Sequence, residues 1–192
     1  MTTNPTPTVS PMASPTAPSI APPAAYDRRT IALHWLTAAF VAGLWIVGQT
    51  IDFFPKGAPR TAMRSLHICF GAALVLILAY RIRWRLAEGV RMPALSHAER
   101  AAAFAYKLLY LLMIATVLLG LFNAWVRGDS LFGLWRIPAY DPGNRDLRET
   151  IEEAHSIAAD ALLVLAALHA AVALAHHWLL KDGVLCRMLP ER

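Results

Sequence analysis

The sequence has few charged residues and very little cysteine. Asp, Glu, Lys and Arg make up 16% of its 192 residues, whereas soluble domains carry about 25%. Only two cysteines occur, Cys69 and Cys186. The topology argued below places them on opposite sides of a membrane, so no disulfide is expected. A Cys-x-x-Cys-His motif is also missing, which excludes covalent attachment of a c-type haem by the usual motif.

Apolar residues, in contrast, are abundant and come in long runs. Hydrophobic residues make up 57% of the chain and gather in runs over 31–51, 66–82, 104–126 and 157–180. Each run is near the roughly 20 residues that a helix needs to cross the hydrocarbon core of a bilayer. Since lipid offers no partner to unpaired backbone groups, these runs must be helical. The expected fold is an all-α integral membrane protein, an antiparallel bundle of four transmembrane helices.

The positive charge follows this topology. The net charge is +5, but the basic residues form no aromatic-interleaved patch of the kind that binds nucleic acid, so no nucleic-acid partner is expected. With a cytoplasmic N-terminus, eleven of the 18 Lys and Arg residues lie on the inner side: Arg28, Arg29, Arg81, Arg83, Arg85, Arg91, Arg100, Lys107, Lys181, Arg187 and Arg192. The positive-inside rule therefore predicts that both termini of this multi-pass chain are cytoplasmic.

The chain divides into a tail and one membrane domain. Residues 1–25 hold seven of the 13 prolines and no charged side chain, which predicts a disordered Pro/Thr/Ser/Ala-rich tail without a secretory signal. Residues 26–192 form the predicted transmembrane domain. Pro55 and Gly57 mark the first turn, and Ser96 with Glu99 resembles a capping box before the third helix. The longest predicted connection is 127–154, whose aromatic residues suit the outer interface.

Six of the seven histidines lie in or beside the apolar runs, where ionisable side chains are costly and normally face the interior of a bundle. His155 and His169 are fourteen residues apart, so they share a helix face and lie about 21 Å apart along its axis. His34 is near the inner start of helix one and His67 at the outer start of helix two. Each can therefore meet a helix-four histidine at a matching depth and bind the iron of a porphyrin.

Spacing alone leaves three assignments open. His176 follows His169 by seven residues and competes with it as the inner ligand. His177 points away from this face and is expected at the interface, and His97 is expected to face solvent in a polar connection. Gly71 lies one turn after His67, where a missing side chain would serve either a haem plane or close helix packing.

The residues resemble the prokaryotic di-haem cytochrome b561 family over roughly 26–190. The resemblance is carried by Leu33-His34-Trp35-Leu36, by His67 with Cys69 and Gly71, by Arg127-Gly128, and by the closing stretch from His155 through His169 and His176-His177 to Lys181-Asp182 and Leu185-Cys186-Arg187-Met188. It implies two b-type haems, the inner one held by His34 and His169 and the outer one by His67 and His155. His176 then becomes a candidate for an inner-side quinone pocket, beside the reading of a plain interfacial histidine.

The expected function is transmembrane electron transfer between an outer-face donor and the membrane quinone pool, which makes the chain an oxidoreductase. Lys56, Arg60 and Arg64 form a basic turn before His67, opposed by Asp52 alone, and would attract a small anionic or a protein donor. Members of the family that oxidise superoxide with ubiquinone make this reaction the specific expectation. Association of two copies in the membrane is left open.

Two other functions are compatible with the same histidines. The chain would serve as the haem-bearing membrane anchor of a dehydrogenase or hydrogenase, or as a transition-metal transporter. The transporter is disfavoured because Asp160 is the only acidic residue inside a predicted span, and its position suggests the outer edge.

Overall fold

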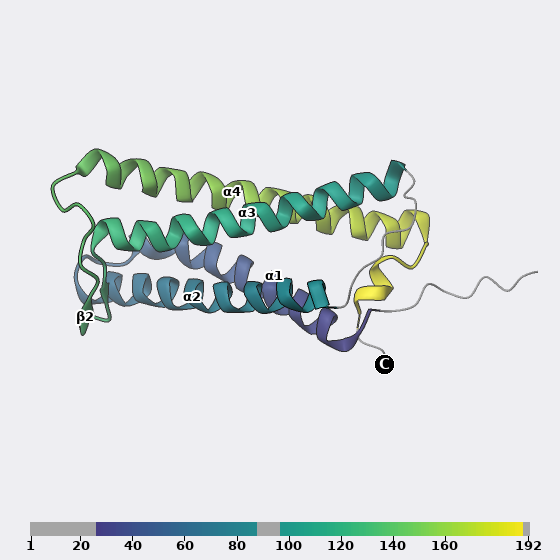
Figure 1. Ribbon diagram of the computed structural model, residues 1–192, viewed down its shortest axis with the longest axis horizontal. Coiled ribbons are helices and arrows are strands. Elements are labelled where there is room, and N and C mark those ends of the chain that lie inside the picture. Colours follow the sequence, from purple (N-terminus) through teal and green to yellow (C-terminus); the bar gives the residue numbers. More distant parts are fainter. Residues whose placement is uncertain (1–25, 88–96, 190–192) are drawn as a thin grey trace, which may run out of the picture.

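Four long antiparallel helices run side by side through the structure, a computed structural model that describes residues 26–87 and 97–189 (Figure 1). The helices are α1 (Arg28–Thr50), α2 (Ala58–Ala87), α3 (His97–Arg127) and α4 (Arg145–Ala175). Each is long and apolar enough to span a bilayer. The predicted four-helix membrane fold is confirmed, whereas the cytoplasmic location of the termini stays a prediction.

The two ends of the bundle differ. Strands β1 (Ser130–Leu131) and β2 (Trp135–Arg136) pair antiparallel at one end, which we call the hairpin end (Figure 1). α1 begins and α4 ends at the opposite end, which we call the terminal end. There α4 continues into a π-helical turn, His176–Leu180, and a 3-10 turn, Leu185–Met188.

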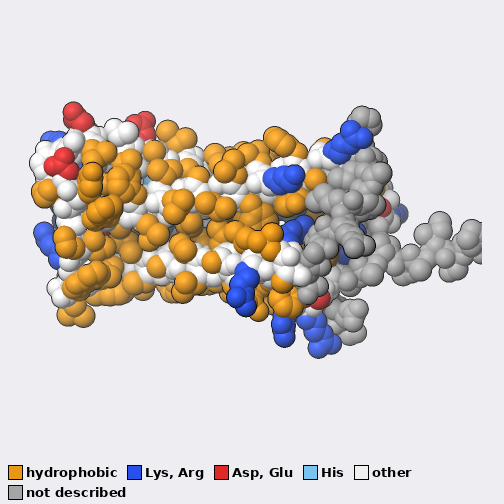
Figure 2. All heavy atoms as spheres, in the orientation of Figure 1, with side chains coloured by type: hydrophobic (Ala, Val, Ile, Leu, Met, Phe, Trp, Pro, Cys, Tyr) orange, Lys and Arg blue, Asp and Glu red, His pale blue; other side chains and the backbone are white. Residues whose placement is uncertain are grey.

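Figure 2 shows an apolar band around the middle of the molecule, with charged side chains gathered toward its two ends. Several large apolar residues of the band are exposed, among them Leu76, Leu111 and Val164. Few side chains are fully buried, and a small core of Leu78, Met113 and Leu162 joins α2, α3 and α4. Such a surface suits hydrocarbon, because lipid removes the penalty that water imposes on exposed apolar groups.

Helix α4 begins earlier than the sequence predicted. Residues 145–154 were expected in the long connection but form three helical turns. Asn144 caps them by accepting from the Leu147 amide at 3.0 Å, and the Arg145–Glu149 pair at 2.8 Å supports the first turn. Apolar runs reveal only the part of a helix that lies in lipid, so a polar extension beyond the membrane escapes this criterion.

The rest of that connection folds onto the start of α2. The Ser65 hydroxyl is fully buried; it accepts from the Phe132 amide at 2.8 Å and lies 3.1 Å from the Ser130 carbonyl oxygen. Gly128 has a φ of +65°, and a Cβ there would lie 2.8 Å from the Cβ of Ala139. Only glycine fits this turn, which explains why the Arg127-Gly128 pair stands out in the sequence.

Two further predictions concern the start of α3. The Ser96–Glu99 capping box lies outside the described residues, since Ser96 and the Glu99 side chain are not described. His97, expected in a connection, is the first residue of the helix. The predicted tail at 1–25 is likewise outside the described residues.

Candidate functional site

Four of the predicted histidines meet in two pairs. The ring centroids of His67 (α2) and His155 (α4) are 6.1 Å apart, and those of His34 (α1) and His169 (α4) are 6.3 Å apart. We call them the hairpin-end pair and the terminal-end pair. The nearly equal separations show that α4 presents one histidine to a partner helix at each of two depths.

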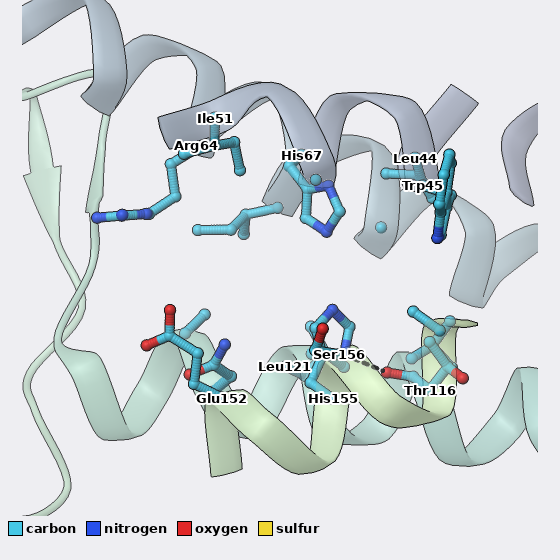
Figure 3. Close-up of a pocket in the computed structure, with 18 of the residues that line it drawn as sticks. Leu44, Trp45, Ile51, Arg64, His67, Thr116, Leu121, Glu152, His155 and Ser156 are labelled. Atoms are coloured by element: carbon cyan, nitrogen blue, oxygen red, sulfur yellow. Dashed lines mark hydrogen bonds between the residues drawn. The ribbon is translucent and has the colours of Figure 1, made fainter. Parts of the chain in front are cut away.

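A cavity of about 340 Å³ surrounds the hairpin-end pair. In Figure 3 the His67 and His155 rings point toward one another across it. Apolar side chains of all four helices form its deeper wall, including Leu44, Leu74, Val117 and Leu162. Its polar rim at the hairpin end is lined by Arg64, Arg127, Asp129 and Glu152. The cavity is therefore amphipathic along the bundle axis.

Three glycines shape the space around this pair. A Cβ on Gly120 would lie 2.9 Å from His155 Cε1, and a Cβ on Gly48 would lie 3.2 Å from His67 Cε1. Both glycines therefore let a helix backbone approach an imidazole closely. Gly71 also lines the cavity, but nothing lies within 4 Å of where its Cβ would be. Gly71 therefore faces open space and does not serve close helix packing.

Helix α3 fixes the orientation of His155. The Nδ1 atom of His155 lies 3.1 Å from the carbonyl oxygen of Thr116. A carbonyl only accepts, so Nδ1 carries the proton and donates it. The lone pair of the neutral imidazole is then on Nε2, which is the form that binds a metal.

The basic turn at the hairpin end is more neutralised than the sequence suggested. Arg60 pairs with Asp52 at 3.1 Å, as expected, but Arg64 pairs with Asp129 at 3.5 Å. Asp129, far along the chain, was missed as a second opposing carboxylate because the hairpin brings it there. Among these described basic side chains only Lys56 has no ion pair.

Asp129 is the centre of this polar rim. Its side chain is 10% exposed and also lies 3.7 Å from Arg127, which pairs with Glu152 at 2.6 Å. Burial raises the pKa of Asp129, while Arg127 and Arg64 act in the opposite direction. The rim thus couples a buried carboxyl group to two guanidinium groups beside the cavity.

His176 does not join the terminal-end pair. Its Nδ1 lies 2.5 Å from Oδ2 of Asp182, and this partly exposed pair joins the first residue of the π-helical turn to the residues just after it. Hydrogen bonds from His176 and from the Val184 amide hold the pKa of Asp182 below its usual range. Next to it, His177 Nδ1 is 4.0 Å from Cys186 Sγ. His176 is therefore an imidazole backed by a carboxylate.

Asp160, expected near the outer edge, contacts α1. It follows His155 by five residues, about 7.5 Å further toward the terminal end. Its Oδ1 accepts from Trp45 Nε1 at 2.8 Å and lies 3.4 Å from Gln49 Nε2. The carboxylate thus joins α4 to α1 between the two histidine pairs. No group of three or more metal-ligating His, Cys, Asp or Glu side chains occurs within 26–87 and 97–189.

Comparison with known proteins gives a consistent result. Residues 25–191 match the family profile described as prokaryotic cytochrome b561. The chain belongs to this family. It is 30% identical over 173 residues to the probable superoxide oxidase CybB of Yersinia pestis, covering 87% of this chain and 97% of that protein. It is 31% identical over 172 residues to cytochrome b562 of Cereibacter sphaeroides, covering 87% and 96%. It is also 29% identical to cytochrome b561 homolog 1 of Escherichia coli, covering 87% and 98%.

As a prokaryotic cytochrome b561, the chain is a multi-pass protein of the bacterial inner membrane that carries electrons and binds haem b. Sequence reasoning found the four paired histidines and Gly71. It missed Gly48, Gly120 and Thr116, which support the histidines from α1 and α3. Their signal is weak, because a glycine or threonine in an apolar helix has many structural uses.

Proposed function

We propose that this cytochrome b561 holds two b-type haems, one between His67 and His155 and one between His34 and His169. It carries electrons from a donor at the hairpin end to a quinone at the terminal end. The observation that supports this most strongly is the similar spacing of the two pairs, 6.1 and 6.3 Å between ring centroids. Two imidazole–metal bonds of about 2 Å each require a separation of this size.

The hairpin-end cavity fits the group. A porphyrin is a flat apolar disc with two carboxylates on one edge, and the cavity has an apolar depth and a rim with Arg64 and Arg127. Gly71 leaves room beside His67, and the protonated Nδ1 of His155 leaves Nε2 free to ligate. When bound, haem supplies one-electron oxidation and reduction at iron. The apolar walls keep water from the ligating nitrogens.

The two histidine pairs lie at different depths along α4, so haems bound there would form a path from one face of the membrane to the other. His155 and His169 are about 21 Å apart along α4, so the two sites divide the hydrocarbon thickness between them. The distribution of Lys and Arg supports a cytoplasmic terminal end and an outer hairpin end. An outer donor then reaches the hairpin-end site first.

Superoxide is the proposed donor and ubiquinone the proposed acceptor. The similarity to the probable superoxide oxidase CybB supports this choice, and Lys56 provides a free positive charge at the hairpin end. Two superoxide anions release two electrons and become two molecules of oxygen; the quinone takes these electrons and two protons and becomes quinol. His176, whose imidazole is hydrogen-bonded to Asp182, would donate a proton to the quinone oxygen.

An oxidised-minus-reduced optical spectrum with a haem-to-protein count tests the proposal. Two haems per chain are expected, with loss of one in His67→Ala and of the other in His169→Ala. A protein with one haem, or with none, contradicts the two-pair arrangement. Superoxide added to holoprotein in ubiquinone-containing vesicles should reduce the quinone, and no reduction would exclude superoxide as the donor.

A further inference from the structure

Arg81 takes, on α2, the place that a second histidine has on α4. It follows His67 by fourteen residues, the same interval that separates His155 from His169. Fourteen residues return a helix to nearly the same face, about 21 Å further along. Arg81 accordingly lies beside the terminal-end pair, with its Nη2 3.3 Å from Nδ1 of His34.

This contact and iron ligation by His34 exclude one another. A guanidinium has only donors, so Nδ1 of His34 must accept from Arg81 through its lone pair. If iron binds Nε2, the neutral imidazole carries its proton on Nδ1, and two donors then face each other. If iron binds Nδ1, the lone pair is used by the metal. In both cases Arg81 loses its partner at His34 when the site is loaded.

The described part of the chain supplies Arg81 with no carboxylate in exchange. The described residues contain no ion pair to Arg81. This differs from the hairpin end, where Arg64 and Arg127 have Asp129 and Glu152. A guanidinium that is partly buried in an apolar bundle without a counter-ion is costly. Among the described residues, no acidic side chain takes this role, and an anion from outside the polypeptide would supply the missing charge.

A second unused donor is in the same place. The guanidinium carbon of Arg81 lies 5.4 Å from the ring centroid of Tyr110 on α3. The Tyr110 hydroxyl is buried and has no hydrogen-bond partner in the described structure. Buried polar groups rarely remain unpaired. When His34 ligates iron, the Arg81 guanidinium and the Tyr110 phenol thus both lack an acceptor.

From these observations we infer that Arg81 and Tyr110 bind a carboxylate of the haem held by His34 and His169. When this haem binds, the Arg81 guanidinium moves its hydrogen bond from His34 to the haem carboxylate. The inference rests on the proposed two-haem arrangement. It makes Arg81 a positioning residue, which orients the terminal-end haem and raises its reduction potential, because a nearby cation favours the reduced, less positive iron.

Redox titration of holoprotein in nanodiscs tests this. In Arg81→Gln the terminal-end haem should be reduced with an equilibrium constant about tenfold lower, about 59 mV for one electron, or should be lost while the hairpin-end haem is retained. Arg81→Lys should keep most of the potential. Tyr110→Phe should shift it in the same direction by a smaller amount. The control is Arg83→Gln, an exposed arginine two residues away, which should change neither haem.

The outcomes separate the possibilities. Two retained haems with unchanged potentials in both Arg81→Gln and Tyr110→Phe would overturn the inference while leaving the two-haem proposal intact. If Arg81→Gln fails to assemble, Tyr110→Phe decides. A wild-type protein with fewer than two haems would instead refute the proposed function. An Arg81→Gln effect seen in phosphatidylglycerol but absent in phosphatidylcholine nanodiscs would assign the anion to lipid phosphate and overturn the haem carboxylate.

Discussion

The Nδ1 atom of His155 lies 3.1 Å from the carbonyl oxygen of Thr116, so a backbone group of α3 orients a side chain of α4. A backbone acceptor cannot be removed by substituting the side chain of Thr116. We therefore expect Thr116→Val to keep the hairpin-end haem, whereas His155→Ala loses it. Haem content and optical spectra of the two variants check this. Loss of the haem in Thr116→Val would show that its side chain, and not its carbonyl, supports the site.

Gly120→Ala should weaken the hairpin-end site through steric conflict alone. The new Cβ would come within 2.9 Å of His155 Cε1, and such overpacking typically costs about 1–3 kcal/mol. We expect partial loss of the hairpin-end haem and retention of the other. Gly48→Ala should act more weakly through His67, at 3.2 Å. Gly43→Ala, also on α1 with nothing within 4 Å of its Cβ, is the matched control and should leave the haem content unchanged.

Asp129 should make the hairpin-end haem sensitive to pH. Burial raises its pKa above the usual value near 3.8, so the carboxyl loses its proton at a higher pH than an exposed aspartate does. The charges of Arg127, Arg64, Glu152 and Arg148 also act on it. The negative charge that then develops favours oxidised iron, so the potential should fall as pH rises through the raised pKa. Asp129→Asn should flatten this slope and raise the potential at neutral pH. An unchanged slope in the variant would assign the pH dependence elsewhere.

The same carboxyl sets the sign of a stability effect. Since the folded chain holds this proton more tightly than the unfolded chain, the contribution of Asp129 to the free energy of unfolding is most favourable below pH 3.8 and declines as pH rises through the folded pKa. Thermal unfolding of wild type and Asp129→Asn, followed by Soret absorbance at several pH values, measures the difference.

Lys56 should affect the rate at which an anionic donor arrives. It has no ion pair among the described residues of the basic turn, whereas Arg60 and Arg64 are neutralised by Asp52 and Asp129. Lys56→Gln should slow haem reduction by superoxide about two- to threefold at low salt, with the difference fading as ionic strength rises. Arg60→Gln should have a smaller effect on this rate. A larger effect in Arg60→Gln would contradict the view that its ion pair with Asp52 neutralises the charge of Arg60.

Asp182→Asn should impair the quinone step and leave haem loading intact. Hydrogen bonds from His176 and Val184 keep the pKa of Asp182 low, so the carboxylate is charged at physiological pH and holds the His176 imidazole through Nδ1. Without this acceptor the rate of quinone reduction should fall while both haems are retained. His177→Ala is the control, since its imidazole contacts Cys186 instead. Equal effects of both variants would argue against a specific role for His176.

The sequence predicted the helices and the histidine stripe on helix four from regular spacing, whereas the choice of His169 over His176 came from the family resemblance. Apolar runs identify what lies in lipid, and a fourteen-residue interval identifies a shared face of one helix. Gly48, Gly120 and Asp129 were not predicted, since each acts by approaching another helix or turn, and such contacts depend on how helices pack. The early start of α4 at Arg145 was missed because its polar turns lie beyond the apolar run.

The fourteen-residue interval also restricts which insertions and deletions the chain can tolerate. One residue inserted or deleted between His155 and His169 would turn one ligand about 100° from the other and displace it by about 1.5 Å along the axis. The same holds for the stretch from His67 to Arg81 on α2. These two intervals should therefore keep a constant length among homologues even where their side chains vary.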